Sequence, residues 1–235
     1  MKKILNDLQK SNEDSLNVLE NLYKLMKISD KNFKKDRLYL NKAFPEMTKI
    51  WLSNFEKIDI VKYILIAEAP LWGESPSYIY NTETPFTQFF YKSDLEKALG
   101  ISLCCKKRFL EKLNDIGFVI IDISPFALNN KTKINYSKQT KGSKKISPKN
   151  YKELVSATMP FYFEKKLELI KSKLNQKDPV VFFRYSRVQK AFENILSESL
   201  KRHNLIDDNS LISNIGMNGG GISVENLKNI INPIP

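Results

Sequence analysis

Two acidic residues in this chain each end an apolar run of strand length and come shortly before a proline. Glu68 follows residues 63–67 and precedes Pro70, and Asp122 ends the run 118–122. Such runs are typical of buried parallel strands, and open α/β sheets bind their ligands at the carboxyl ends of the strands. We therefore expect both carboxylates at one edge of a sheet. The alternative for Glu68 is a structural role, in which it caps a helix or pairs with a lysine.

The segment after the first run is more aromatic than a solvated connection needs to be. Its aromatic residues are Trp72, Tyr78, Tyr80, Phe86, Phe89, Phe90 and Tyr91. A carboxylate beside stacked aromatic rings predicts a pocket for a flat ring. Most aromatic side chains serve core packing, however, and this second interpretation also applies to Phe86.

The charge of the chain favours a polyanionic partner. The formal net charge is +12 and the isoelectric point is near 9.5; nucleic acid is the commoner explanation, although a lysine-rich composition also follows from a low-GC genome. No acidic residue lies within 123–152, while lysines accumulate there, among them Lys141, Lys144 and Lys145. We interpret this segment as a phosphate-binding surface. The alternative is a disordered, solvated loop.

Two further segments could contact phosphates. Arg184 and Arg187 follow a third apolar run, 179–183, at the start of a helix, whose free amide groups favour anions; either arginine could instead pair with an acid. Residues 216–221 contain four of the eight glycines. Such a density indicates unusual dihedral angles or close approach of the backbone, or else a flexible turn. It matches neither a dinucleotide-binding fingerprint nor a P-loop.

The remaining pattern supplies the elements that position these residues. Helices are predicted over 2–28, 45–55, 93–100, 102–116, 150–174 and 223–231. A further helix follows Arg187 and ends near His203, and a short fourth strand is predicted over 210–215. These elements predict an α/β fold: a three-layer sandwich with a central four-stranded parallel sheet flanked by helices. Residues 1–58 form an N-terminal helical extension packed on the core, and residues 59–235 the α/β domain.

Several classes of protein are excluded by composition. The only cysteines, Cys104 and Cys105, are adjacent, so we expect no disulfide, no zinc and no iron–sulfur cluster, and we predict buried, inert thiols. No apolar run approaches the roughly 20 residues of a membrane span, and the N-terminus lacks a signal peptide pattern. We expect a cytoplasmic protein without membrane contact, monomeric by default.

Residues 64–70, Ile-Leu-Ile-Ala-Glu-Ala-Pro, followed by Thr-Glu-Thr-Pro-Phe at 82–86, resemble the opening motif of the uracil-DNA glycosylase superfamily. The cluster-bearing branch of that family has a strand ending Gly-Glu-Ala-Pro-Gly, then Gly-Arg-Pro-Phe at similar spacing. The resemblance continues in order through 118–125, 180–183 and 213–221, and covers roughly residues 60–230. It implies a parallel four-stranded sheet flanked by helices.

The resemblance also implies base flipping, followed by cleavage of the N-glycosidic bond. Under it, Glu68 positions or activates the water, or stabilises the oxocarbenium-like sugar, and Asp122 reads the Watson–Crick edge of the base. Phe86 stacks on the base, and Ala69, Pro70 and Asn214 complete its site. The loop with Gly216, Met217, Asn218 and Gly219 presses into the duplex, with Met217 as a wedge, and the basic residues Lys141, Lys144, Lys145, Arg184 and Arg187 contact DNA.

Three departures from the family pattern refine this expectation. Asp122 replaces the base-reading asparagine, and a carboxylate accepts hydrogen bonds without donating any unless it is protonated. We therefore predict an amino-bearing or modified base, such as a cytosine derivative, rather than plain uracil. The loop histidine is absent, since His203 is the only histidine. The cluster cysteines are also missing, so no cofactor is expected. No lysine is predicted beside Glu68, which favours a monofunctional glycosylase.

Two other classes stay open. The first is a catalytically inactive nucleic-acid-binding module of the same fold, in which both acids are structural. The second is a hydrolase of nucleosides, nucleotides or other small phosphorylated ligands. A basic stripe beside Glu68 would favour DNA, and an even scatter of charge the small ligand.

Overall fold

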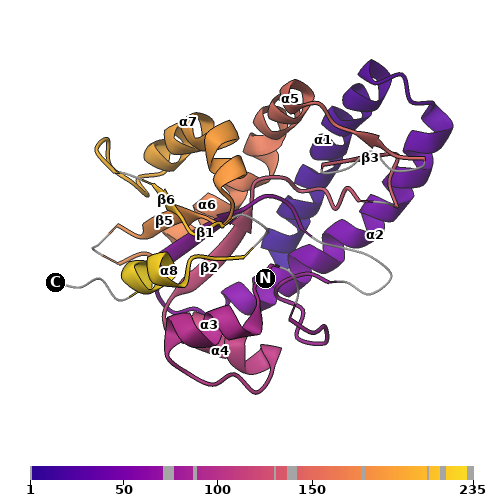
Figure 1. The fold of residues 1–235 in the computed structure, drawn as a ribbon. Coiled ribbons are helices and arrows are strands. Elements are labelled where there is room, and N and C mark those ends of the chain that lie inside the picture. Colours follow the sequence, from indigo (N-terminus) through magenta and orange to yellow (C-terminus); the bar gives the residue numbers. More distant parts are fainter. Residues whose placement is uncertain are drawn as a thin grey trace.

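The computed structural model describes residues 2–70, 77–86, 89–129, 131–136, 142–175, 178–210, 212–217 and 221–231. Their central sheet has four parallel strands in the order β2-β1-β5-β6 (Figure 1). The strands are β1 (Tyr63–Ala67), β2 (Phe118–Asp122), β5 (Val180–Phe183) and β6 (Ser213–Asn214). The predicted fold class is confirmed. β6 is shorter than the sequence pattern indicated, with only two residues in the sheet.

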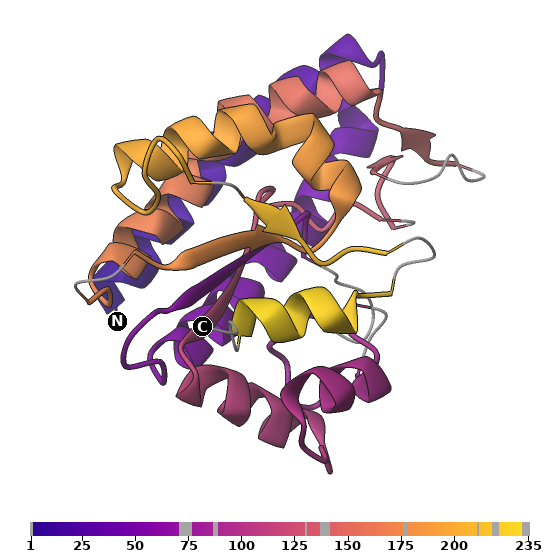
Figure 2. The same ribbon diagram turned by 60° about the vertical axis from the view of Figure 1, so that its left-hand side comes forward.

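Helices cover both faces of this sheet. They are α1 (Lys2–Leu25), α2 (Asp30–Phe55), α3 (Lys92–Leu99), α4 (Lys106–Asp115), α5 (Pro148–Thr158), α6 (Phe163–Lys171), α7 (Ser186–Arg202) and α8 (Val224–Ile231). In Figure 2, α1, α5 and α7 lie above the sheet, and α3, α4 and α8 lie below it. β1 is buried from Ile64 to Ala67 and β2 over its whole length. This explains why both read as continuous apolar runs rather than alternating ones.

Pro45 lies inside α2 and not at its start, which corrects the sequence prediction. A proline inside a helix removes a backbone hydrogen bond and costs about 3 kcal/mol. The buried apolar stripe of α2 nevertheless continues on both sides of it, through Phe33, Leu40, Ala43, Phe44, Met47, Trp51, Leu52 and Phe55. Each large apolar side chain buried in this way contributes about 1.5–3 kcal/mol, so the stripe offsets the proline.

α2 also covers the outer edge of β2. The Ile120 carbonyl accepts a hydrogen bond from the Trp51 indole at 2.9 Å, and the Ile120 amide donates to the Tyr80 hydroxyl at 2.6 Å. These side chains satisfy backbone groups that would otherwise need another strand. Leu8 and Trp51 belong to the same hydrophobic core as the strands, so the N-terminal helices pack directly on the sheet.

A second hydrophobic cluster joins α1 and α2 to the segment that follows β2. Its buried members include Leu16, Leu19, Tyr23, Phe33, Phe126, Leu128, Ile134 and Ile146. The segment carries a small parallel ribbon, β3 (Ile134–Asn135) and β4 (Lys144–Lys145). Buried Asp36 fixes this ribbon to the helices, because it accepts hydrogen bonds from the Tyr23 hydroxyl at 2.5 Å and the Lys133 amide at 2.6 Å. The described part of the lysine-rich segment is therefore folded.

Other helix boundaries differ from the predictions. α3 and α4 begin after Tyr91 and Cys105 instead of after Ser93 and Ser102. The second shift follows from Leu103, which is completely buried and whose amide donates to Glu96 Oε1 at 2.8 Å instead of to a helix carbonyl. The helix predicted over 150–174 is two helices, α5 and α6, separated by a short 3-10 turn, η1 (Met159–Phe161). This turn contains Pro160, whose nitrogen has no hydrogen to donate to the helical pattern.

Alanine substitutions at Gly117 and Gly100 test how closely Gly117 packs against the chain before β1. Both have positive φ, +77° and +66°, but a Cβ on Gly117 would lie 2.3 Å from the Ile60 carbonyl oxygen, whereas a Cβ on Gly100 meets nothing within 4 Å. We expect Gly100→Ala to lower the free energy of unfolding by about 1–2 kcal/mol, the cost of left-handed backbone. Gly117→Ala should lower it further, because the chain must move. Urea unfolding measures both, and equal losses would contradict the close approach.

Candidate functional site

The two carboxylates singled out by sequence lie at the carboxyl ends of neighbouring strands. Ala67 and Asp122 are partners in the register of β1 and β2, and Glu68 is the next residue after Ala67. The chains stay paired just beyond the strands, because the Ser124 amide donates to the Glu68 carbonyl at 3.1 Å. The two acids are close enough to interact electrostatically, since the charge of Glu68 contributes to a higher pKa for Asp122.

Glu68 is largely withdrawn from water and pairs with one arginine. Its side chain is 14% exposed, and Arg187 in the first turn of α7 donates a hydrogen bond to its Oε2. Burial raises the pKa of Glu68. The charge and hydrogen bond of Arg187, and the Tyr151 hydroxyl, offset only part of this rise. The Arg187 side chain is itself 59% exposed, so solvent and other charged groups can reach the ion pair from the arginine side.

Asp122 is more deeply enclosed than Glu68. Burial raises its pKa to about 6, and the nearby Lys166 ammonium and Tyr78 hydroxyl counteract part of this rise. Lys166 is also buried, and its pKa falls to about 8 for the same reason. Its ammonium donates to the Tyr162 hydroxyl at 2.7 Å and lies over the Trp51 ring, 4.7 Å from the centroid. Asp122 therefore sits beside an enclosed cation and can change protonation state close to neutral pH.

Tyrosines surround the two acids. The carboxylate charges of Glu68 and Asp122 are among the causes that raise the pKa of Tyr136, Tyr151 and Tyr185, after burial itself. The rings of Tyr136 and Tyr151 are 4.8 Å apart. The buried Tyr151 hydroxyl makes no hydrogen bond of ordinary geometry with the described residues.

One of these tyrosines ties the site to the small ribbon. The Tyr136 hydroxyl lies 2.6 Å from Ser124 Oγ and also donates to the Phe126 carbonyl at 3.1 Å. Tyr136 directly follows β3, so this contact joins the ribbon to Ser124, two residues beyond Asp122.

The site therefore brings two carboxyl groups of unequal burial close enough to interact electrostatically. Neighbouring carboxyl groups whose environments differ are a common basis of acid–base chemistry near neutral pH. Glu68, which keeps contact with solvent, is suited to orient a water molecule. Asp122 is suited to hydrogen-bond a polar edge, and the tyrosine rings favour a flat ligand.

The predicted base-binding residues are only partly brought together. Ala69 and Pro70 directly follow Glu68, the first half-buried and the second buried. Phe86 packs against Phe109, with ring centroids 5.5 Å apart, and borders the hydrophobic core. These contacts agree with the packing interpretation of Phe86 and provide no support for base stacking.

Asn214 is occupied by contacts within the protein. Its Oδ1 accepts from the Ser186 hydroxyl at 2.8 Å, and its Nδ2 donates to Gln189 Oε1 at 2.6 Å. Both partners lie on α7, so this side chain joins β6 to that helix. The structure thus gives Asn214 a positioning role in the fold.

Arg184 is buried and not on the surface, which corrects its assignment to phosphate binding. It is 0% exposed, and its guanidinium donates to the Phe89 carbonyl at 2.7 Å and to the Gly221 carbonyl at 3.2 Å. It also lies over the Tyr185 ring, 4.5 Å from the centroid. Arg184 therefore connects the segment before α3 to the glycine-rich loop.

The described part of the glycine-rich loop turns back on itself. Gly216 forms an antiparallel bridge with Ile222, and a Cβ at Gly216 would lie 2.9 Å from the Arg184 carbonyl oxygen. This glycine permits close backbone packing. Met217 is 59% exposed, as a wedge into a duplex requires. Of the other predicted DNA contacts, Asn218, Gly219 and Lys141 lie outside the described residues.

The cysteines correct another prediction. Cys104 and Cys105 are both exposed, with their sulfur atoms 3.7 Å apart. Backbone amides of Arg108 and Lys107 at the start of α4, together with Cys104, lower the pKa of Cys105. The buried residue in this part of the chain is their neighbour Leu103.

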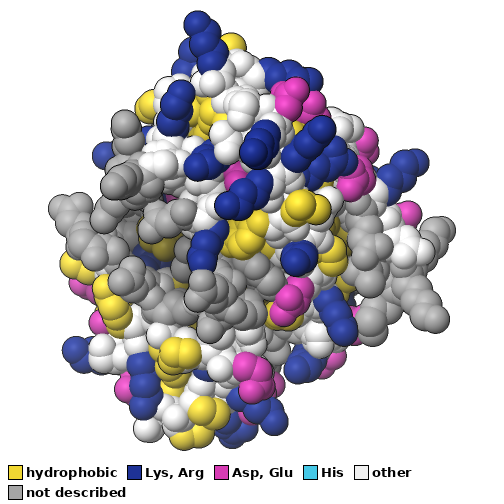
Figure 3. Space-filling view, turned by 90° about the vertical axis from the view of Figure 1, so that its right-hand side faces the viewer, with side chains coloured by type: hydrophobic (Ala, Val, Ile, Leu, Met, Phe, Trp, Pro, Cys, Tyr) yellow, Lys and Arg dark blue, Asp and Glu magenta, His cyan; other side chains and the backbone are white. Residues whose placement is uncertain are grey.

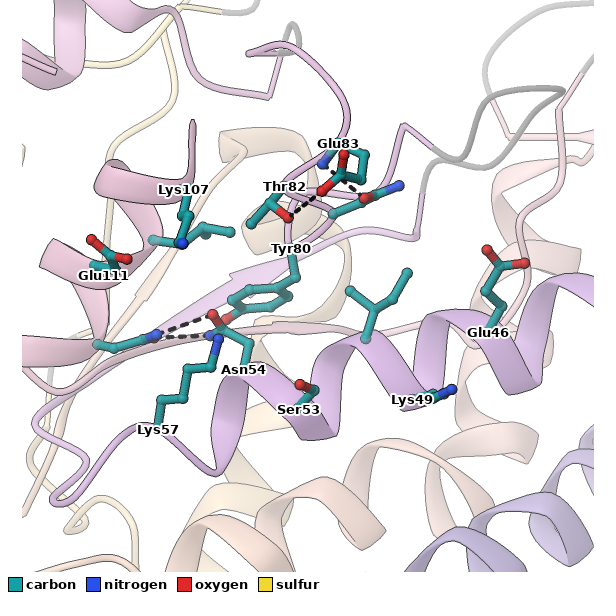
Figure 4. Close-up of a pocket in the computed structure, with 14 residues that line it drawn as sticks. Glu46, Lys49, Ser53, Asn54, Lys57, Tyr80, Thr82, Glu83, Lys107 and Glu111 are labelled. Atoms are coloured by element: carbon teal, nitrogen blue, oxygen red, sulfur yellow. Dashed lines mark hydrogen bonds between the residues drawn. The ribbon is translucent and has the colours of Figure 1, made fainter. Parts of the chain in front are cut away.

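A groove of about 500 Å³ lies between α2, the turn at 80–83 and α4 (Figure 4). Its floor includes Asn54 and Asn114, whose amides hydrogen-bond each other at 2.9 and 3.1 Å. Its charged rim carries both signs: Lys49, Lys57, Lys107, Glu46, Glu83 and Glu111. Because its polar floor is satisfied internally and its charges balance, the groove resembles an ordinary polar surface more than an anion site.

Comparison of the chain with protein-family models, with curated proteins and with solved structures gives no match in any of the three. Among the described residues, no cluster of three or more histidine, cysteine or acidic side chains could hold a metal ion. None of their helices has both the length and the apolar character needed to cross a membrane.

Several residues of this site were missed by sequence reasoning. Lys166 was unremarkable within a helical pattern, since lysine is almost never fully buried. Its spacing of four residues from Tyr162 would place the two on one helix face, but this signal is weak. Tyr136 and Tyr151 lie within the lysine-rich segment 123–152, and only the tertiary structure brings them near Glu68.

Glu68→Gln should stabilise the protein at pH 7. The folded-state pKa of Glu68 is raised by burial, so the ionised carboxylate destabilises the folded state at pH values above that pKa. The penalty disappears as the pH falls below the unfolded value, roughly 4.3. We therefore expect a gain in unfolding free energy at pH 7 and none at pH 4.

Urea unfolding at both pH values measures this difference, with Glu153→Gln, a change at an exposed position of α5, as the control. Destabilisation of Glu68→Gln at pH 7 would instead mean that the Arg187 ion pair outweighs the burial cost and that Glu68 is a structural residue.

Proposed function

We propose that this protein is a DNA glycosylase that hydrolyses the N-glycosidic bond of a flipped, amino-bearing or modified base. The observation that carries the proposal is the pair of unequally buried carboxyl groups, Glu68 and Asp122, at the carboxyl ends of β1 and β2. The net charge of +12 supports a polyanionic substrate. The parallel four-stranded sheet agrees with the fold implied by the resemblance to the uracil-DNA glycosylase superfamily.

In this mechanism Glu68 acts on the water. Its ionised carboxylate orients a water molecule toward C1′ of the sugar and stabilises the positive charge that develops there as the C1′–N bond breaks. The bonding electrons leave with the base and the water oxygen bonds to C1′. The proton that the water loses passes to the Glu68 carboxylate and from there, through solvent, to the departing base. Burial strengthens these electrostatic interactions, because the carboxylate has little competing solvent.

Arg187 must release Glu68 for this role. Its ion pair with Glu68 is exposed on the arginine side, so a phosphate group of bound DNA is a suitable alternative partner for the guanidinium. Binding of substrate then frees the carboxylate. Arg187 is therefore retained as a proposed DNA contact, and the free protein holds it on the acid.

Asp122 reads the base. Its pKa is about 6, so at pH 7.5 it is mainly ionised and accepts a hydrogen bond from an exocyclic amino group. Below pH 6 it becomes protonated and can donate to a keto oxygen. The enclosed Lys166 ammonium and the Tyr78 hydroxyl fix its orientation and partly offset its burial.

The direct test is release of a base from a panel of duplex and single-stranded DNA substrates. The panel contains cytosine derivatives, uracil, hypoxanthine and damaged purines, and alkali converts abasic sites to strand breaks. We expect cleavage of at least one amino-bearing substrate and a loss of at least about 100-fold with Glu68→Gln, the typical contribution of a positioned acid–base group. Glu153→Gln serves as the control.

Other outcomes identify the alternatives. DNA binding that is equal in wild type and Glu68→Gln, with no break in any substrate, would overturn the proposal in favour of a binding module. Hydrolysis of free nucleosides, without dependence on polymer length, would indicate a small-ligand hydrolase.

Base selectivity should depend on pH through Asp122. As pH falls from 7.5 to 5, protonation of Asp122 should lower the rate ratio of amino-bearing base to uracil, because the acceptor becomes a donor. The ratio cancels the effect of Glu68 protonation, which acts on both substrates. Asp122→Asn, which donates and accepts at every pH, should raise uracil release relative to wild type and remove the pH dependence. A ratio that is independent of pH in the wild type would contradict base reading by Asp122.

A further inference from the structure

A basic recess lies between the turn joining α1 to α2 and the β3–β4 ribbon. It has a volume of about 530 Å³ and is lined by Lys27, Ile28, Ser29, Asn32, Lys133, Gly142, Ser143 and Lys144. Three of these lining residues are lysines, which come from three separate segments of the chain, and none of the lining residues is acidic. This distinguishes the recess from the groove of Figure 4, whose charges balance.

Backbone hydrogen bonds and one ammonium contact place the lysines of the recess on the fold. The Lys133 amide is bonded to Asp36 at 2.6 Å, and the Lys144 amide donates to the Lys133 carbonyl at 2.8 Å. The Lys144 ammonium contacts the Met26 carbonyl at the end of α1 at 3.4 Å, and Lys133 Nζ would lie 3.8 Å from a Cβ on Gly142. The backbones of these lysines therefore belong to a folded surface, so binding an anion orders only their side chains.

The recess is open to solvent and lies on a basic face. Lys27, Ser29, Gly142 and Lys144 are exposed. Figure 3 shows the side of the molecule on which α2 and the ribbon lie, where Lys and Arg side chains are more frequent than Asp and Glu. An open recess of this kind suits a chain that passes along the surface better than a small molecule that must be enclosed.

The recess is also close to the acids along the chain. Only β3 separates Lys133 from Tyr136, a distance of roughly 10 Å at about 3.3 Å per residue. Tyr136 contacts Ser124, whose amide is bonded to the Glu68 carbonyl. In Figure 2 the β6 arrow points to the side of the molecule on which the ribbon lies. Backbone phosphates of one DNA strand follow each other at about 3.4 Å along the helix axis, so the step from Lys133 to Tyr136 corresponds to about three nucleotides.

We infer that the recess formed by Lys27, Lys133 and Lys144 binds backbone phosphates of the DNA strand next to the flipped nucleotide. The inference rests on the proposed function for the position of the base, while phosphate binding itself does not require catalysis. It assigns a role to the N-terminal helices, because Lys27 follows α1 and completes a site that the ribbon alone would leave open.

The test is the salt dependence of DNA binding. A double variant, Lys27→Ala with Lys144→Ala, is compared with Lys97→Ala with Lys112→Ala, which removes two exposed lysines of α3 and α4 at the other end of the molecule. Fluorescence anisotropy with a labelled duplex gives the association constant between 50 and 200 mM salt. All proteins also carry Glu68→Gln, so base release plays no part and failure of the glycosylase proposal leaves this test intact.

We expect the recess variant to bind more weakly and its slope of log K against log salt to become shallower by about 2, roughly one per lost phosphate contact. The control should keep the slope of the parent protein. Equal changes in both variants would mean a general effect of charge and would overturn the inference, as would an unchanged slope. Displacement of DNA by inorganic phosphate or a mononucleotide at low millimolar concentration would reassign the recess to a small phosphorylated ligand. Circular dichroism confirms that each variant is folded.

Discussion

The structure depends on one register: β1 and β2 run parallel with Ala67 opposite Asp122. Because of it, two acidic residues 54 positions apart in sequence share one edge of the sheet, in surroundings that raise the pKa of both. Holding two carboxyl groups there opposes folding, and the apolar strands and the helices around them must offset it. Such an arrangement is more easily explained by chemistry than by stability.

The surrounding elements maintain this arrangement. Trp51 and Tyr80 satisfy the outer edge of β2, so this strand needs no further neighbour. Arg184 holds the glycine-rich loop beneath the segment before α3, and Asp36 holds the ribbon on the N-terminal helices. The N-terminal helices thus do two things: they complete the core beside Asp122, and they present Lys27 next to the ribbon.

The sequence predicted the sheet well because buried parallel strands have a simple signature. The runs at β1, β2 and β5 are continuous and apolar, and acidic residues stand at the ends of the first two. The prediction that Pro45 begins a helix was wrong, because it used only the preference of proline for the first turn, whereas the buried apolar stripe of α2 stabilises the helix on both sides of Pro45. Arg184, Lys166 and the tyrosines could not be placed, because burial of charged groups and convergence of distant residues arise from tertiary contacts that leave no periodic pattern.

The central claim is that Glu68 and Asp122 act on the same bound nucleotide, the first on the water and the second on the base, and a double-mutant cycle tests it most directly. Single-turnover rates of base release are compared for wild type, Glu68→Gln, Asp122→Asn and the double variant, on the substrate that the wild type cleaves fastest. Residues that act as a unit are not additive, so the account predicts that the double variant is about as slow as the slower single variant. Rates that multiply independently, or a Glu68→Gln variant as fast as wild type, would contradict it.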